Sequence, residues 1–265
     1  MRKSYGKNQN RKYIQLGILG ISFIFFLLLI RGVLASAHAY CPYSLVCFGT
    51  WNIFTKGVPF IFSIAIIFGI LILVSSIFLG RWFCGYACPI GTIQELVYST
   101  KHTKKKFNQL IPYKIHKYLN IIKYVILIFT IVAAILSSQA LYMKFCPILA
   151  IAHPQTITIA GIISLLIIVV GGYFVERFWC RYICPFAALM NLMQKFADFL
   201  KIKRYKIFRN IHTSLNCFNC PNYCPMYIDI GDNEKINSPN CIKCFKCVRL
   251  CSTEDPKNST CIYRD

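Results

Sequence analysis

Four long apolar stretches constrain this chain more than any other feature. They cover Ile14 to Ile30, Val58 to Leu79, Leu119 to Leu136 and Ile157 to Val175. Each is about 20 residues long, which is enough for a helix to cross a hydrocarbon core of roughly 30 Å. Charged residues make up 15% of the chain and apolar residues 56%, whereas soluble domains carry roughly 25% charged residues. A simple soluble enzyme is therefore excluded, and we expect an α-helical polytopic membrane protein with four transmembrane helices.

The basic residues predict the orientation of these helices. The chain has 30 lysines and arginines against 9 acids, a formal net charge of +21. They are concentrated in residues 1–13 and 80–118, while the other two loops between the stretches are nearly bare. Because cytoplasmic segments are enriched in Lys and Arg, we expect both termini in the cytoplasm, as in a bacterial inner-membrane protein. This topology signal, together with attraction of residues 201–209 to anionic lipid, accounts for the net positive charge. Nucleic-acid binding is therefore not needed to explain it.

The first stretch has an alternative interpretation as a cleavable signal peptide, since Ala35-Ser36-Ala37 follows it. Its apolar run is longer than the usual roughly 7 to 15 residues. It also has a counterpart in the middle of the chain, which cannot be a signal peptide. We therefore expect the first helix to be retained.

A nine-residue segment occurs twice, and we call its copies frame 1 and frame 2. Frame 1 is residues 81–89 (RWFCGYACP) and frame 2 is residues 177–185 (RFWCRYICP), with five of nine positions identical. Each frame follows an even-numbered apolar stretch, while Cys41-Pro42 and Cys146-Pro147 follow the odd-numbered ones. The chain is thus expected to form two parallel two-helix repeats, related by a pseudo-twofold axis along the membrane normal.

This symmetry places the frame cysteines together at the cytoplasmic face; they are Cys84, Cys88, Cys180 and Cys184. If the helices continue into the frames, a spacing of four puts both thiols of a pair on one side, and the following prolines disrupt the helix. Simple packing of small cysteines is the alternative, but it does not explain why the whole frame repeats. The frames therefore predict a redox or metal site, in which a shared cluster, dithiol chemistry and transient metal all remain open.

The opposite face carries a second group of chemically notable residues, namely Cys41, Cys47, Cys146, His38 and His153. In an oxidising compartment we expect a disulfide between Cys41 and either Cys47 or Cys146. The two histidines are expected to be solvated or interfacial, with proton acceptance as the alternative.

Residues 201–265 are predicted to form a small C-terminal ferredoxin-like iron-sulfur domain that follows a membrane domain of residues 1–200. The run Cys241-x2-Cys244-x2-Cys247-x3-Cys251 has the bacterial ferredoxin spacing. That spacing wraps three thiolates around one [4Fe-4S] cube and sends the fourth to a neighbouring cube. Zinc is the alternative for any Cys-x2-Cys pair, but this spacing favours iron-sulfur over zinc.

An earlier run, Cys217-x2-Cys220-x3-Cys224-Pro225, is shorter than the ferredoxin pattern and lacks one cysteine. By the crossed ligation of two-cluster ferredoxins, Cys224 completes the cube held by Cys241, Cys244 and Cys247. Cys251 then joins Cys217 and Cys220 at a second cube, which needs another ligand. Cys261 is the expected one, with His212, a water or a partner protein as alternatives.

The four stretches, the two frames and the cysteine-rich tail together resemble the membrane-bound ferredoxin-type proteins of the Nap and Nos systems, the NapH/NosR-like quinol dehydrogenase family. The resemblance implies a quinol dehydrogenase subunit of anaerobic respiration. Such a subunit passes electrons from membrane quinol through [4Fe-4S] clusters and partner iron-sulfur or cytochrome subunits toward a periplasmic nitrate or nitrous-oxide reductase. The shortened run of Cys217 to Cys224 departs from the usual tail of this family. The direction of electron flow stays open, because a cytoplasmic tail can also accept electrons from a soluble donor.

Two other functions remain as alternatives. One is a polyferredoxin-type copper reductase or assembly factor, in which the frame cysteines bind or reduce the metal. The other is a membrane anchor whose cluster is structural. Transport is disfavoured, because the apolar stretches contain no interior acid pair and Glu176 lies at an end.

Overall fold

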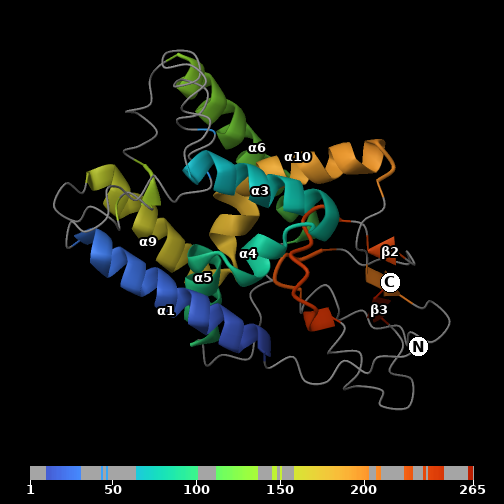
Figure 1. Ribbon diagram of the computed structural model, residues 1–265, viewed down its shortest axis with the longest axis horizontal. Helices are drawn as coiled ribbons and strands as arrows, with labels where there is room; N and C mark the ends of the chain where they lie inside the picture. The colour runs from blue at the N-terminus through green and yellow to red at the C-terminus, as the bar shows by residue number, and fades with distance from the viewer. Residues whose placement is uncertain are drawn as a thin grey trace.

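The computed structural model describes the chain in several segments. They are residues 10–30, 43, 46, 64–100, 112–136, 145–147, 150, 158–202, 207–209, 224–228, 235–236, 238–247 and 262–264. These residues are mostly helical, with one small sheet near the C-terminus (Figure 1).

The four apolar stretches correspond to helices α1 (Asn10–Ile30), α3 (Ile64–Leu79), α6 (Tyr113–Ile135) and α9 (Ile159–Phe174). Long apolar runs without proline favour such helices. The helix α9 begins after Thr158, whose Oγ1 accepts a hydrogen bond from the backbone nitrogen of Gly161 at 3.3 Å. Residues 58–63 and 157, which we expected in the second and fourth stretches, lie outside the described residues.

Among the described residues, α6 is the helix that is both long and apolar enough to cross a bilayer. It has 23 residues, and the mean hydropathy of its most apolar 18-residue window is 2.2. The apolar segments Ile66–Leu79 and Ile159–Phe174 are shorter. The arrangement of four transmembrane helices therefore remains a prediction.

The helices do not continue into the frames, so the condition for placing both thiols of a pair on one helix side is not met. The helix α3 ends at Leu79, and Gly80 follows with a φ of +69°, a left-handed conformation that only glycine adopts freely. The helix α9 ends at Phe174, and Arg177 has a φ of 58°. Each frame therefore leaves the axis of its helix and forms a turn of its own.

These turns are the short helix α4 (Trp82–Tyr86) in frame 1 and the π-helical turn η6 (Trp179–Ile183) in frame 2. The prolines that close the frames do not end a helix but begin one. The helix α5 (Pro89–Ser99) and the helix α10 (Pro185–Phe199) both start at these prolines. The first helical position suits proline, because its backbone needs no N–H there.

The two halves of the repeat pack on each other reciprocally. The helix α5 of the first half contacts α9 of the second, and α10 of the second half contacts α3 of the first. Within the halves, α1 contacts α5 and α6 contacts α10. Figure 1 shows α5 between α1 and α9, and α3 beside α10. The pairings are equivalent under exchange of the halves, which agrees with a pseudo-twofold relation.

The small sheet brings distant parts of the tail together. It contains β1 (Ile207–Arg209), β2 (Lys235–Ile236) and β3 (Ile262–Arg264), in the order β2-β1-β3. Both pairings are antiparallel, with Ile207 opposite Ile236 and Phe208 opposite Tyr263. The division of the chain into domains at residue 200 remains a prediction.

The core lies where the frames meet the tail. The buried side chains of Cys84, Phe186 and Met190 pack in one cluster with Met226 and Ile242 of the tail. Burying a large apolar side chain stabilises a fold by about 1.5 to 3 kcal/mol. Met226 and Ile242 of the tail are therefore packed against residues of frame 1 and of α10.

Candidate functional site

The first residue of each frame is an arginine with a fully buried side chain. Arg81 donates from Nη2 to the carbonyl oxygen of Cys180 at 2.9 Å. Arg177 donates from Nη1 to the carbonyl oxygen of Cys84. Each bond runs from the first position of one frame to the first cysteine of the other. These reciprocal hydrogen bonds join the two frames and fix the backbone at Cys84 and at Cys180.

The four frame thiols lie together at this junction. The Cys88 and Cys180 side chains are hydrogen-bonded across the frames, and Cys180 interacts electrostatically with Cys84 and Cys184. Cys84 and Cys180 are buried, whereas Cys88 and Cys184 are half-buried. The structure thus brings together the four cysteines that the repeat singled out, and their chemical role remains a prediction.

Two features of the surroundings act in opposite directions on these cysteines: burial disfavours the thiolate, and the nearby Arg81 favours it. Burial raises the pKa of the Cys84 thiol, and it raises the pKa of Cys184 to about 12. At Cys180 the hydrogen bond with Cys88 and burial both raise the pKa, while Arg81 lowers it at all three thiols. A cysteine that binds a metal ion must do so as the thiolate. Buried arginines beside buried thiols therefore suit a site that holds an anionic metal-thiolate centre.

A second group of thiols lies in the tail. Cys224, Cys241, Cys244 and Cys247 line one pocket, together with apolar residues that include Met226, Ile228, Ile242 and Phe245. These are the four cysteines that crossed ligation assigns to the first cube. Burial raises the pKa of Cys224 to about 12 and also raises that of Cys241, where Lys243 opposes it.

The tail pocket offers the ligand set of a [4Fe-4S] cube, because four cysteines line it. Among the described residues, no three His, Cys, Asp or Glu side chains converge closely enough to hold one metal ion. A [4Fe-4S] cube takes each thiolate at a different iron atom, so its ligands stand farther apart than those of one ion. The tail pocket can therefore hold a cube. The remaining expected ligands, Cys217, Cys220, Cys251 and Cys261, and the alternative His212 lie outside the described residues, and the second cube stays a prediction.

The segment of residues 238–247 rests directly on frame 1. A Cβ atom at Gly85 would lie 2.3 Å from the carbonyl oxygen of Ile242, so only glycine permits this approach. The Tyr86 hydroxyl donates to the carbonyl oxygen of Lys243 at 3.3 Å. Arg81 and Lys123 both donate to Oδ1 of Asn240, at 3.4 Å and 2.6 Å. The tail pocket is thereby held against the frame thiols.

Frame 2 contacts the tail through residues 224–228. The Arg181 guanidinium lies 5.2 Å from the ring centroid of Tyr227, a cation–π contact. The ring of Tyr227 also packs edge-on against His116 of α6, with centroids 5.4 Å apart. His116 Nδ1 lies 3.0 Å from both Arg181 Nη2 and the Tyr182 hydroxyl. Because a guanidinium only donates, Nδ1 accepts, which places the ring proton on Nε2. Frame 1 therefore contacts residues 238–247 and frame 2 contacts residues 224–228.

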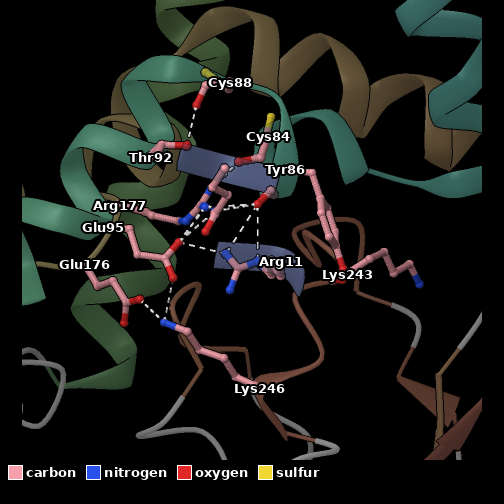
Figure 2. A network of polar contacts seen from close by, with 12 residues as sticks. Arg11, Cys84, Tyr86, Cys88, Thr92, Glu95, Glu176, Arg177, Lys243 and Lys246 are labelled. Carbon is pink, nitrogen blue, oxygen red and sulfur yellow. Dashed lines mark hydrogen bonds and ion pairs between the residues drawn. The ribbon is translucent and has the colours of Figure 1, made fainter. Parts of the chain in front are cut away.

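Glu95 joins three parts of the chain in one ionic network, which Figure 2 shows. Its Oε2 atom lies 2.7 Å from Nη2 of both Arg11 and Arg177, and its Oε1 atom lies 3.1 Å from Nζ of Lys246. Lys246 also pairs with Glu176. Burial raises the pKa of Glu95, but Arg177, Lys246 and Arg11 outweigh it and hold the pKa well below its usual range. Glu95 is therefore ionised and links α1, frame 2 and the tail.

The sequence analysis missed this network and the buried arginines. Glu95 is the single acid among the basic residues of 80–118, and an arginine begins both frames. These two signals were present in the sequence, but neither identifies its partner. The residues expected on the opposite face, Cys41, Cys47, His38 and His153, lie outside the described residues. Cys146 is buried, and its pairing stays a prediction.

Two segments of the chain match a family model described as a 4Fe-4S binding domain. They cover residues 60–108 and 157–206. Frame 1 lies in the first segment and frame 2 in the second. The match therefore recognises both copies of the repeat. No solved structure matches the chain significantly.

The curated relatives include an electron transport protein and ferredoxin-type proteins. The putative electron transport protein YccM of Escherichia coli is 26% identical over 209 residues, covering 76% of this chain and 57% of YccM. The uncharacterized protein MJ0750 of Methanocaldococcus jannaschii is 32% identical over 190 residues, covering 70% of this chain and 74% of MJ0750.

The ferredoxin-type protein NapH of Haemophilus influenzae is 22% identical over 201 residues, covering 72% of this chain and 66% of NapH. The chain thus spans between about half and three quarters of the length of these relatives. With its duplicated cysteine frames inside both matched segments, the chain belongs to the NapH/NosR-like family of ferredoxin-type 4Fe-4S electron-transport proteins.

Proposed function

We propose that the chain is a membrane electron-transfer protein that accepts electrons from quinol and passes them through iron-sulfur centres toward a periplasmic reductase. The observation that supports this proposal is that the tail pocket and the frame thiols both adjoin the same pair of buried arginines, Arg81 and Arg177. Arg81 acts electrostatically on Cys84 and on Cys241. Arg177 is influenced by both Cys180 and Cys244. Redox centres bound at these two groups of thiols would be near neighbours, an arrangement that suits electron transfer between them.

The faces of the helices support a membrane location. Large apolar side chains are exposed along α1, α3, α6 and α9, including Phe23, Leu71, Ile128 and Leu166, each more than half exposed. Soluble monomers rarely expose contiguous apolar patches above a few hundred Å². Lipid contact accounts for these faces, and quinol dissolved in the same lipid can reach the frames at the helix ends.

In this proposal Cys224, Cys241, Cys244 and Cys247 hold one [4Fe-4S] cube, and Cys217, Cys220, Cys251 and Cys261 contribute to a second. Iron-sulfur centres supply one-electron transfer. The frame cysteines form the redox or metal site nearest the apolar helices. The nitrate or nitrous-oxide type of reductase, and its partner iron-sulfur or cytochrome subunits, are carried over from the family resemblance.

Reduction by quinol tests this function. The protein, purified anaerobically in detergent, is mixed with a reduced menaquinol analogue while the visible iron-sulfur absorbance is followed. We expect the absorbance to bleach in the native chain. Cys244→Ser should lose the tail cluster signal and serve as the matched control. Intact clusters that dithionite reduces but quinol does not would contradict a quinol dehydrogenase role.

One observation favours copper handling as the second candidate. Cys84 Sγ lies 3.8 Å from Met190 Sδ, and thiolate with thioether is a ligand pair that selects Cu(I). In that function the frame cysteines bind or reduce copper, and the tail cluster supplies electrons. Stoichiometric copper bound to the frames, with loss of binding in Met190→Leu, would favour it over quinol oxidation.

A further inference from the structure

The two frame arginines share an unusual feature beyond their reciprocal hydrogen bonds. In both Arg81 and Arg177 the Nε atom is buried and has no hydrogen-bond partner among the described residues. Both side chains are 0% exposed. Buried polar groups are nearly always paired, because an unmade hydrogen bond costs about 1 to 3 kcal/mol. The same atom is unpaired at equivalent positions of both frames, so the feature belongs to the design of the repeat.

Among the described residues, the positive charge of Arg81 has no carboxylate as a partner. Within the described part of the chain its side chain donates to the carbonyl oxygen of Cys180 and to Oδ1 of Asn240, which are both neutral. Lys123, likewise fully buried, donates to the same Oδ1 atom. A buried charge is costly unless an opposite charge faces it. An anion is therefore required near Arg81.

The contacts of the arginines show where that anion lies. Arg81 is hydrogen-bonded to the backbone of the frame cysteine Cys180 and to Asn240, the residue before Cys241 of the tail pocket. Arg177 is hydrogen-bonded to the backbone of the frame cysteine Cys84, and Glu95 links it to Lys246, which lies between Cys244 and Cys247 in the sequence. Each guanidinium is therefore joined both to a frame cysteine and to the tail segment that carries the pocket thiols.

We propose that Arg81 and Arg177 are positioning residues that hold anionic iron-sulfur centres at the frame and tail thiols and raise their reduction potentials. The proposal rests on the iron-sulfur role proposed above. A centre ligated by thiolates becomes more negative when it gains an electron. A nearby guanidinium stabilises the reduced form more than the oxidised form, so the potential rises. Hydrogen bonds toward cluster sulfur act in the same direction.

A redox titration of charge variants tests the proposal. The full chain is purified anaerobically and titrated with dithionite and mediators, with the iron-sulfur signals followed by electron paramagnetic resonance. In Arg81→Gln we expect a more negative midpoint potential at unchanged iron content. The equilibrium constant for reduction should fall about tenfold, which lowers the midpoint potential by about 59 mV for a one-electron couple. Arg81→Lys keeps the charge and loses the planar guanidinium. Its midpoint potential should lie between those of the native chain and Arg81→Gln.

Lys117→Gln is the matched control, because it removes a positive charge from an exposed position on α6. Its potential should equal that of the native chain. An unchanged potential in Arg81→Gln at full iron content overturns the proposal, as does an equal shift in Lys117→Gln. If Arg81→Gln loses its iron, Arg81→Lys decides: a lower potential at full iron content supports the proposal, and an unchanged one overturns it.

The titration separates this inference from the proposed function. Dithionite reduces the centres whatever the natural donor is. A potential that responds to Arg81, in a protein that quinol fails to reduce, leaves the inference standing and contradicts only the quinol role. Absence of iron and acid-labile sulfide from the purified native chain would overturn both.

Discussion

A single carboxylate, Glu95, holds more of this molecule together than any other charged side chain that the structure describes. Arg11 and Arg177 both lie 2.7 Å from it, and Lys246 lies 3.1 Å away. Its side chain is 15% exposed, so the charges are only weakly screened. Removing the carboxylate charge would leave Arg11 and Arg177 close together without an ionised partner among the described residues, while Lys246 would keep Glu176.

Glu95→Gln is therefore expected to destabilise the protein by about 3 kcal/mol at neutral pH, as when one partner of a buried ion pair is removed. The folded-state pKa of Glu95 is depressed, so its stabilisation is present above its unfolded pKa, about 4.3, and is lost as the pH falls below that value. The difference in melting temperature between Glu95→Gln and the native chain should shrink in acid. Glu176→Gln is the control, because Glu176 pairs with Lys246 alone among the described residues. An equal loss in both variants would contradict the central role of Glu95.

Gly85 provides a second test at the residue scale, since its missing side chain lets the tail approach frame 1. In Gly85→Ala the new methyl group would meet the carbonyl oxygen of Ile242 at 2.3 Å. We expect a cost of about 1 to 3 kcal/mol from overpacking and a loss of tail iron. Gly20→Ala in α1 is the control, because nothing lies within 4 Å of a Cβ there and alanine favours the helix. Iron content per chain is the measurement, and full iron in Gly85→Ala would refute the docking of the tail on this glycine.

At the scale of elements, the repeat was predictable and its consequences were only partly so. The two frames predicted two equivalent halves and four cysteines at one place, and the thiols do lie together. The sequence did not predict α5 and α10, because the prolines were taken as helix breakers rather than first helical residues. Nor did it predict the left-handed turn at Arg177, since a non-glycine residue at positive φ depends on surrounding contacts.

The convergence of the frames makes a prediction about their cysteines. If Cys88 and Cys184 serve one redox site, Cys88→Ala and Cys184→Ala should each reduce quinol oxidation by at least tenfold while the tail cluster remains assembled. The double variant should be no worse than either single variant, because residues that act as one unit are not additive. The measurement is the rate per mole of intact tail cluster. Near-normal rates in both single variants would favour packing cysteines and the membrane-anchor alternative.

At the scale of the whole molecule, the sequence alone attributes the net positive charge to membrane topology. The structure adds a second role for some of the basic residues. Of the 30 lysines and arginines, Arg81, Arg177, Arg181 and Lys123 are at most 1% exposed. They lie where the frames meet the tail rather than at the surface of the protein. Charge counts along a sequence reveal which segments are basic, but burial depends on which distant segments pack together. That packing was beyond the reach of the sequence, as was the close fit of the tail on the frames.

The structure also bears on whether the first helix is retained. Arg11 and Gln15 of α1 donate hydrogen bonds to the carbonyl oxygen of Gly85, at 3.3 Å and 2.9 Å, and both side chains are buried. Arg11 also pairs with Glu95. Cleavage near residue 37 would remove these partners from frame 1. The contacts therefore support a retained helix, and the side of the membrane on which the N-terminus lies stays a prediction.

Topology is the last prediction. Because residues 1–13 and 80–118 carry most of the basic residues outside the tail, reporter fusions should be active in the cytoplasm at Asp265 and in the periplasm near Thr50. Mass spectrometry of the purified protein should find Arg11 and Gln15 in the mature chain. A periplasmic signal at Asp265 would place the tail pocket on the wrong side for a cytoplasmic cluster domain. A mature chain that begins at His38 would contradict the role of α1, because the carbonyl oxygen of Gly85 would then lose two buried donors and keep only the longer bond from Arg177, at 3.4 Å, among the described residues.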